Sequence, residues 1–253
     1  MKQGLFPRGS KISAMGGDIV AAKAFSRKQA VFNEKAQQYA RQGVITTPGY
    51  LRLEITPGNA ATSAINFNCL DTSGVKTATE RRLKLADTFT ITDISFYIGY
   101  GSATSYAPTA AQYANQRLAT YPNPGLAAFS GVTDNLETIY NGFLSLRIDT
   151  TTFLDSVPMR QFYRVGTSQQ VTAGTNQNGI GRDEWPLAMY GRNELLPTIE
   201  LNGQANIEFS LNLPNATNIQ AASTYYTNMV LILTGFLNQG AATVQRSIQS
   251  KLR

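Results

Sequence analysis

The sequence contains no histidine and one cysteine, Cys69, in 253 residues. Histidine is the side chain most often used as a general base near neutral pH and as a metal ligand. Its absence excludes Ser-His-Asp and Cys-His catalytic arrangements, and one cysteine cannot form a cysteine-rich zinc site or an intrachain disulfide. We therefore expect a non-enzymatic protein that folds in a reducing cytoplasm and has no catalytic residue, metal or cofactor.

The sequence is also poor in charge and in long apolar segments. Charged residues make up 15% of the chain, against about 25% in ordinary domains, and Asn, Gln, Thr and Ser supply the remaining polarity. These side chains suit β-edges, turns and protein–protein contacts. The longest apolar stretch, Met229–Leu237, is nine residues long, whereas a membrane-spanning helix needs about 20. Residues 1–7 lack the apolar region of a signal peptide, so we expect neither classical secretion nor membrane integration.

The charges that are present divide the chain into three parts. Residues 1–45 have eight basic and two acidic side chains, residues 46–239 have 11 basic and 14 acidic, and residues 240–253 have three basic and none acidic. The net charges are therefore +6, −3 and +3. Basic ends on a mildly acidic body are typical of proteins that hold nucleic acid or dock on an acidic neighbour, although they are also compatible with two solvated tails.

The N-terminal part predicts a flexible leader followed by a helix over residues 18–42. Asp18 is a candidate N-cap and Gly43 a candidate C-cap. A thin apolar stripe at helical spacing includes the aromatic residues Phe25, Phe32 and Tyr39. Because so thin a stripe buries little surface, the helix needs a partner, which is its own body, a neighbouring subunit or an anionic surface. The candidate nucleic-acid or partner-binding residues are Lys11, Lys23, Arg27, Lys28, Lys35 and Arg41.

From residue 46 the hydrophobic period changes to two, which predicts an antiparallel β body over residues 46–239. The apolar parity switches at Thr92-Asp93, as a β-bulge would produce. Cys69 is expected to be a small buried hydrophobe on a strand, and the last run is apolar enough to be covered on both faces. The predicted strands lie around Leu51–Ile55, Ile65–Cys69, Phe89–Ile98, Phe143–Ile148, Ile207–Leu213 and Tyr225–Phe236.

Two Asn-Gly pairs predict β-hairpins, because Asn-Gly favours the tight turns that join antiparallel strands. Asn141-Gly142 lies between Leu136–Tyr140 and Phe143–Ile148, and Asn202-Gly203 lies between Pro197–Leu201 and Gln204–Leu213. The segments 101–135 and 165–185 are rich in Gly, Ser, Thr, Asn, Ala, Tyr and Pro. We expect them to be loops at the ends of a sandwich.

Each of two charged clusters in the sequence can be interpreted either as a functional site or as a structural feature. In Asp183-Glu184-Trp185 the Trp could stack on a sugar beside two carboxylates, but anchoring of a loop by Trp185 with solvated acids is the favoured interpretation. Glu80-Arg81-Arg82-Leu83-Lys84 could contact nucleic acid, but a solvated loop or strand start is favoured.

A basic helical arm, an antiparallel β body with Asn- and Thr-rich loops and a basic tail together resemble viral coat proteins of the jelly-roll type, bacteriophage capsid proteins in particular. The resemblance lies in the arm Asp18–Arg41 and in the strand regions Phe89–Ile98, Phe143–Ile148, Thr198–Leu213 and Tyr225–Phe236. It implies an all-β antiparallel jelly-roll sandwich. The body length of about 195 residues favours a single roll over a double one, and the double roll remains open.

The resemblance also implies a structural virion protein, assembled in a host cytoplasm into a homo-oligomeric shell with other virion proteins. Its arm would contact the viral genome, an internal membrane or a neighbouring subunit. Two alternatives differ from a shell subunit. One is a tail, neck or spike component of a phage particle. The other is a carbohydrate-binding module or glycosidase that uses Trp185.

Overall fold

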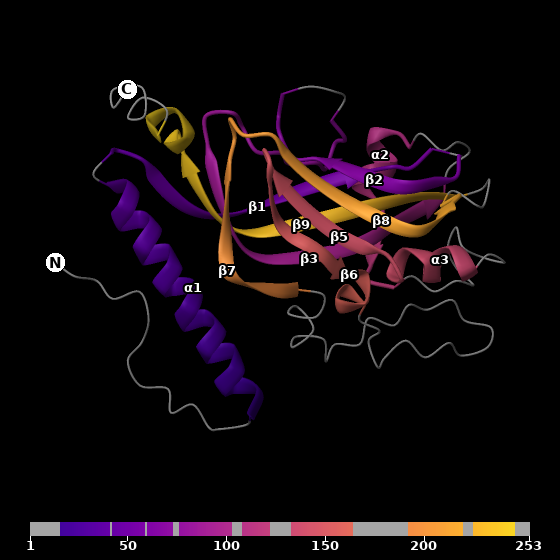
Figure 1. Ribbon diagram of the computed structural model, residues 1–253, viewed down its shortest axis with the longest axis horizontal. Coiled ribbons are helices and arrows are strands. Elements are labelled where there is room, and N and C mark those ends of the chain that lie inside the picture. The colour runs from indigo at the N-terminus through magenta and orange to yellow at the C-terminus, as the bar shows by residue number, and fades with distance from the viewer. Residues whose placement is uncertain are drawn as a thin grey trace.

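The computed structural model describes residues 16–40, 42–58, 60–72, 76–102, 108–121, 133–163, 192–219 and 225–245. Within these ranges the chain forms two antiparallel sheets that pack face to face (Figure 1). Sheet A contains β1 (Ile45–Ile55), β3 (Thr88–Ser102), β4 (Arg117–Ala119), β7 (Arg192–Asn202) and β9 (Tyr225–Gln239). Sheet B contains β2 (Thr62–Asn68), β5 (Phe143–Ile148), β6 (Thr151–Pro158) and β8 (Ile207–Thr217). The prediction of an all-β antiparallel sandwich is confirmed.

The order of the strands follows from their pairing. In sheet A the order is β1–β9–β3, and the far edge of β3 pairs with β7 along one half and with β4 along the other. In sheet B the order is β2–β8–β5–β6. Every pair is antiparallel, so consecutive residues of each strand alternate between the core and the outer face.

The core lies between the two sheets, as the alternating hydrophobic pattern predicts. Leu53 of β1, Phe96 of β3 and Phe209 of β8 are each 0% exposed. Cys69, just after β2, is also 0% exposed, which confirms its assignment as a buried hydrophobe. Burying a side chain of this size contributes about 1.5–3 kcal/mol, so these alternating positions supply most of the favourable free energy of the sandwich.

A β-bulge interrupts β3 at the predicted place. The register of β3 shifts between Ile91 and Asp93 against both β7 and β9. Opposite the bulge, β9 has Gly235, where an added Cβ would lie 1.8 Å from the carbonyl oxygen of Thr90. Only glycine permits this close approach of two backbones. The bulge also turns Asp93 to the outer face, where the helix α1 lies.

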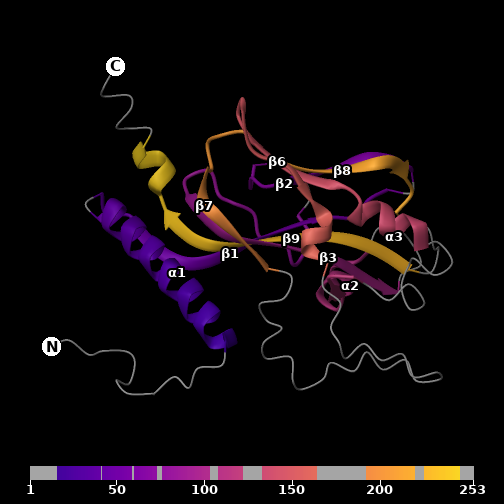
Figure 2. The ribbon, with the colours of Figure 1, turned by 60° about the horizontal axis from the view of Figure 1, so that its bottom comes forward.

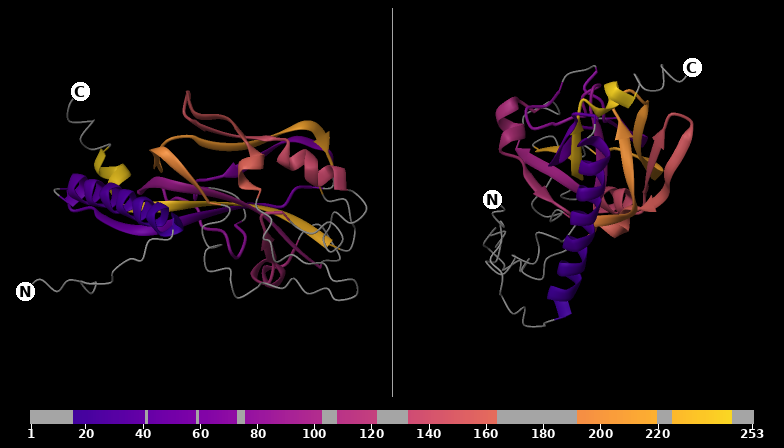
Figure 3. Two further views of the ribbon diagram at one scale, coloured as in Figure 1. Left: turned by 90° about the horizontal axis from the view of Figure 1, so that it is seen from below. Right: turned by 90° about the vertical axis from the view of Figure 1, so that its left-hand side faces the viewer.

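Helix α1 (Gly16–Ala40) lies in the region predicted to be helical. It crosses the end of sheet A where β1 begins and β9 ends (Figures 1 and 2). A helical turn at Ala241–Gln245 follows β9 at this same end. Figure 3 shows that α1 runs across this end of the sandwich rather than along its strands. No helix in the described ranges has the length and hydropathy needed to cross a membrane.

The prediction that both faces of the last strand are covered is confirmed for β9. Met229 and Leu231 face the core, whereas Tyr226 lies on the other face, where its hydroxyl donates to the carbonyl of Gln112 at 2.7 Å. Gln112 belongs to α2 (Ala110–Ala114), a short helix capped by Thr109. At the other end of β9, α1 covers the outer face.

The hairpin predicted at Asn141-Gly142 is wrong, because the first arm is the helix α3 (Thr133–Tyr140). Leu136, Ile139 and Tyr140 are at most 1% exposed, and their i, i+3, i+4 spacing is helical rather than alternating. Gly142 is needed just after the helix, since an added Cβ would lie 2.6 Å from the carbonyl oxygen of Asn212. The Asn-Gly pair therefore joins a helix to β5.

The hairpin predicted at Asn202-Gly203 is also wrong, although both of its strands exist. β7 pairs with β3 in sheet A, whereas β8 pairs with β2 and β5 in sheet B. The turn therefore crosses between sheets. The hairpin that does form joins β5 to β6, and its turn residue Asp149 has a left-handed φ of 52°, which aspartate tolerates better than most residues.

The expectation that residues 101–135 form a loop is wrong where the chain is described. The described part contains α2, β4 and the start of α3. Thr109 and Gln112 form a reciprocal capping box, which is a local signal for α2 that the overall loop-like composition obscures. The predicted loop at 165–185, including Asp183-Glu184-Trp185, lies outside the described residues.

Candidate functional site

The predicted binding helix lies against the body of the chain, and its side chains are described from Phe25 to Ala40. Of the six candidate cations, Lys11 and Arg41 lie outside the described residues, and so does the side chain of Lys23. Arg27 is exposed. The remaining two, Lys28 and Lys35, both contact acidic side chains of sheet A.

Lys28 forms an ion pair with Asp93 at the β-bulge. The Lys28 Nζ to Asp93 Oδ1 distance is 2.7 Å, and the Asp93 side chain is 5% exposed. Thr92 donates its hydroxyl to the other carboxylate oxygen at 2.7 Å. A carboxylate this buried is costly unless it is paired. The bulge therefore presents an acid on the outer face of the sheet, and α1 supplies the matching cation.

A second network holds the C-terminal part of α1 against β7. The carboxylate of Glu200 accepts hydrogen bonds from Lys35 Nζ at 2.6 Å and from the Tyr39 hydroxyl at 2.5 Å. Gln245, in the C-terminal turn, donates its side-chain amide to the Tyr39 oxygen at 2.8 Å. Three segments far apart in sequence therefore meet at one carboxylate.

The pKa shifts of this network follow from the same contacts. Burial by itself would raise the pKa of Glu200, but the hydrogen bonds from Lys35 and Tyr39 and the positive charge of Lys35 outweigh it, so the pKa is lowered. Burial, together with the hydrogen bond to Glu200 and its charge, raises the pKa of Tyr39 to about 12. The network is therefore most stable with Glu200 ionised and Tyr39 protonated.

The predicted aromatic stripe is only partly buried. Tyr39 is 1% exposed, and the ring of Phe32 lies 5.3 Å from that of Phe236 on β9. Phe25, by contrast, is 61% exposed. It lines a cavity of about 360 Å³ between α1 and sheet A, together with Phe32, Pro48 and other residues. The second half of α1 is thus packed on the body, while its Phe25 region presents apolar surface beside the exposed Arg27.

Sequence reasoning missed the body residues that receive the helix. Asp93, Glu200, Phe236 and Gln245 lie on strands or a turn where outward polar residues are normally solvated. One signal was available: the apolar run that includes Phe236 predicts a covered outer face. No pattern in the sequence indicated which element covers it.

Two buried carboxylates, Glu54 and Glu80, lie at the free edge of β1 and merit scrutiny as a catalytic pair. Glu54 accepts hydrogen bonds from Asn228 at 2.9 Å, Thr77 at 3.1 Å and Thr79 at 2.6 Å. Glu80 is paired with Arg82 through two hydrogen bonds of 2.8 Å. Both carboxylates are thus occupied by groups of the protein, an arrangement that suits a structural role.

This network fixes the segment 76–83 to the edges of both sheets. The backbones of Arg52 and Arg81 exchange hydrogen bonds of 2.9 and 2.8 Å. Leu83 donates its amide to the Cys69 carbonyl at 2.8 Å, so the segment bridges β1 to the end of β2. The expectation that Glu80–Lys84 is solvated is therefore wrong in part, because Glu80 and Arg82 are 6% and 9% exposed.

The described residues contain no group of three or more His, Cys, Asp or Glu side chains placed to hold a metal ion. No protein-family model matches this chain, and no curated protein or solved structure matches it.

Proposed function

We propose that this chain is a structural virion protein, a jelly-roll subunit that assembles with copies of itself and other virion proteins into a capsid. The observation that carries the proposal is the pairing of the strands. Apart from the short β4, the eight strands of the described residues pair first with last and so on inward: β1 with β9, β2 with β8, β3 with β7, and β5 with β6.

That set of pairs is the pattern of one long antiparallel hairpin whose tip is the β5–β6 turn. Rolling such a hairpin on itself brings β9 beside β3 and β8 beside β5, which are the two further pairs observed. Alternate pairs of strands thus fall in each sheet, and this pattern supports the proposal of an eight-stranded jelly roll. Because lectins and cupins share this architecture, the fold alone leaves function open.

The N-terminal helix favours a shell subunit among these possibilities. We assign α1 and the basic residues before it to an arm that contacts neighbouring subunits or the genome. Lys28 and Lys35 hold its second half on the body, while Phe25 and Arg27 are exposed. A helix that leaves Phe25 and Arg27 exposed beside residues packed on its own body is suited to making further contacts in an assembly.

The outer face of sheet B also supports the proposal. Its centre consists of uncharged polar side chains that bond one another: Ser210 donates to Asn66 at 2.8 Å, and Asn212 donates to Ser145 at 3.3 Å. Uncharged polar groups have a smaller desolvation penalty than charged ones when another subunit covers them, and the two charged residues beside them, Arg147 and Glu208, are of opposite sign and directly opposite in register. Such a surface is better suited to lateral contacts in a shell than to keeping a monomer soluble.

Light scattering and negative-stain microscopy of the purified full-length chain test the proposal. We expect closed particles, or oligomers that increase in size with concentration. The informative pair of variants is Phe25→Ala and Phe32→Ala. Phe25→Ala should leave the free energy of unfolding within about 0.5 kcal/mol of the unchanged chain and reduce assembly. Phe32→Ala should lower stability by about 1–3 kcal/mol, because it removes the contact with Phe236.

A chain that remains a compact monomer at high concentration, with and without nucleic acid, would contradict the proposal. If Phe25→Ala leaves assembly unchanged, the exposed part of α1 does not contribute to the contacts between subunits. The same micrographs separate a shell subunit from a tail or spike component, because closed isometric particles differ from tubes, rings and isolated trimers.

A further inference from the structure

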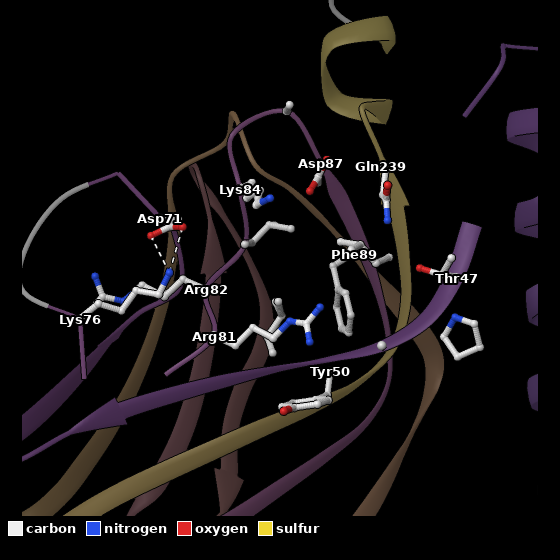
Figure 4. A pocket seen from close by; sticks show the side chains of 16 residues that line it. Thr47, Tyr50, Asp71, Lys76, Arg81, Arg82, Lys84, Asp87, Phe89 and Gln239 are labelled. Carbon is white, nitrogen blue, oxygen red and sulfur yellow. Dashed lines mark hydrogen bonds and ion pairs between the residues drawn. The ribbon is translucent and has the colours of Figure 1, made fainter. Parts of the chain in front are cut away.

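A cavity of about 500 Å³ opens between the first half of β1 and the segment 81–87. Figure 4 shows its lining, in which the Arg81 side chain lies beside Tyr50 of β1 and Lys84 comes from the segment 81–87. The backbones of β1 and this segment are joined at Arg52 and Arg81 and separate beyond that point. The cavity therefore forms where the segment leaves the edge of β1, and Leu83 and Phe89, both 0% exposed, contribute to its apolar lining.

Four cations line this cavity, and two of them are satisfied by neighbouring acids. Lys76 pairs with Asp71 at 3.0 Å, and Arg82 pairs with Glu80. Arg81 and Lys84 are exposed, and no acidic partner for either occurs among the described residues. Asp87, which also lines the cavity, accepts a hydrogen bond from the Gly240 amide at 2.8 Å. The lining thus has four cations against the two carboxylates of Asp71 and Asp87, and Arg81 and Lys84 are the exposed cations without an acidic partner.

The Arg81 guanidinium lies over the ring of Tyr50, 5.3 Å from the ring centroid. Such a cation–π contact holds the planar guanidinium in place while its N–H groups remain free to donate. Tyr50 is itself 47% exposed. The cavity therefore combines the oriented guanidinium of Arg81, the flexible ammonium of Lys84 and the exposed ring of Tyr50. Proteins bind single-stranded nucleic acid with this combination of groups.

We infer that this cavity binds one nucleotide of a single-stranded nucleic acid, with the phosphate at Arg81 and Lys84 and the base stacked on the Tyr50–Arg81 pair. The inference rests on the proposed function, since it supplies a genome contact to a shell subunit. An extended acidic peptide is the competing occupant, because β1 has a free edge here. Pro48 lacks an amide hydrogen at that edge, as proteins do to prevent strand addition, so the nucleotide is favoured.

The position of the cavity agrees with this assignment. It lies at the end of the sandwich where α1 meets the body and where β9 leads into the C-terminal turn (Figures 1 and 4). Thr47, Gly49 and Gln239 belong to its lining. The sequence beyond the turn carries Arg246, Lys251 and Arg253.

The test uses the full-length chain and oligothymidylate labelled with fluorescein, in anisotropy titrations at several salt concentrations. Arg81→Ala and Lys84→Ala should each lower the slope of log K against log salt by about 0.7, the value for one lost phosphate contact in a single strand. Tyr50→Leu should weaken binding by about tenfold with an unchanged slope, because it removes stacking. Arg147→Ala, an exposed arginine on β5 in the other sheet, is the matched control and should change neither.

Photo-crosslinking locates the base independently of the basic ends of the chain. An oligonucleotide carrying 5-iodouracil should crosslink to the peptide containing Tyr50, and Tyr50→Leu should abolish that crosslink. Variants that bind like the unchanged chain, with no crosslink at Tyr50, would overturn the inference. Variants that bind oligonucleotide normally but fail to assemble would also overturn it, and would assign the cavity to a protein contact.

The inference and the proposed function fail in distinguishable ways. Closed particles without the Tyr50 crosslink would support the proposed capsid function and contradict the nucleotide site. A monomeric chain that forms the crosslink, and whose Arg81 and Lys84 variants have reduced salt slopes, would support the nucleotide site and contradict the proposed capsid function.

Discussion

Individual acidic residues have defined structural roles in this chain of low charge. Glu54, Glu80, Asp93 and Glu200 each accept a hydrogen bond from a basic or polar group of a different segment. Each pair joins two pieces of the chain: β1 to the segment that closes the sheet edge, or α1 to the outer face of sheet A. Acids at such positions are indistinguishable from solvated ones in the sequence, because an outward residue on a strand has the same pattern whether or not something covers it.

Glu54 offers the sharpest test at this scale. Replacing it with alanine removes one acceptor from Arg52, from the buried amide of Asn228 and from the half-buried hydroxyl of Thr79. Removing one partner of a buried ionic network costs about 3–5 kcal/mol, so we expect Glu54→Ala to lower the free energy of unfolding by that amount in urea titrations.

The control for Glu54→Ala is Glu194→Ala. Glu194 is an exposed acid on β7, and its removal should change stability by no more than about 0.5 kcal/mol. Equal effects of the two substitutions would show that the Glu54 network contributes nothing to the fold.

At the scale of elements, the docking of α1 depends on the ionisation of its partners. The pKa of Glu200 is lowered from its ordinary value of 4.5, so its contribution to stability is complete above pH 4.5 and is lost as the pH falls through the lower folded-state value. The pKa of Tyr39 is raised from 10.0 to about 12. Its contribution is complete below pH 10 and is lost as the pH rises towards about 12.

We therefore expect the stability difference between the unchanged chain and Glu200→Gln to be constant from neutral pH down to 4.5 and to shrink at more acidic values. Urea titrations of both proteins across this range measure it. Hydrogen exchange of residues 31–40 should show reduced protection in Glu200→Gln at neutral pH. A stability difference that is independent of pH would contradict the assignment of the charged Glu200 as the group that holds the helix.

The elements themselves differ in how well the sequence indicates them. The alternating strands β1, β2, β3, β5 and β8 and the bulge at Thr92-Asp93 were predictable from a hydrophobic period of two, and β9 was predictable from its nearly continuous apolar run. The helix α3 was not predicted: Leu136, Ile139 and Tyr140 fit a short apolar run as well as a helical face, and Asn141-Gly142 suggested a hairpin. Short apolar runs are ambiguous between helix and strand until a neighbouring element selects one.

At the scale of the whole molecule, the accessibility of the Cys69 thiol to reagents measures how often the two sheets separate. The thiol is 0% exposed, and burial raises its pKa to about 12. Since the thiolate is the reactive form, we expect negligible modification by a thiol-specific reagent in native conditions and complete modification in denaturant. The rate should rise in Glu54→Ala, because Leu83 of the segment held by this network donates its amide to the Cys69 carbonyl. Rapid labelling of the native chain would contradict this packing.

The sequence by itself determined the β-sandwich class, the buried cysteine, the position of the bulge and the uneven charge, because these depend on local periodicity and composition. Only the tertiary structure decided which strands pair. β7 and β8 flank an ideal hairpin turn and yet lie in different sheets, because pairing depends on contacts between residues far apart in the chain. For the same reason, only the folded chain brings Glu200 to Lys35 and Arg81 to Tyr50.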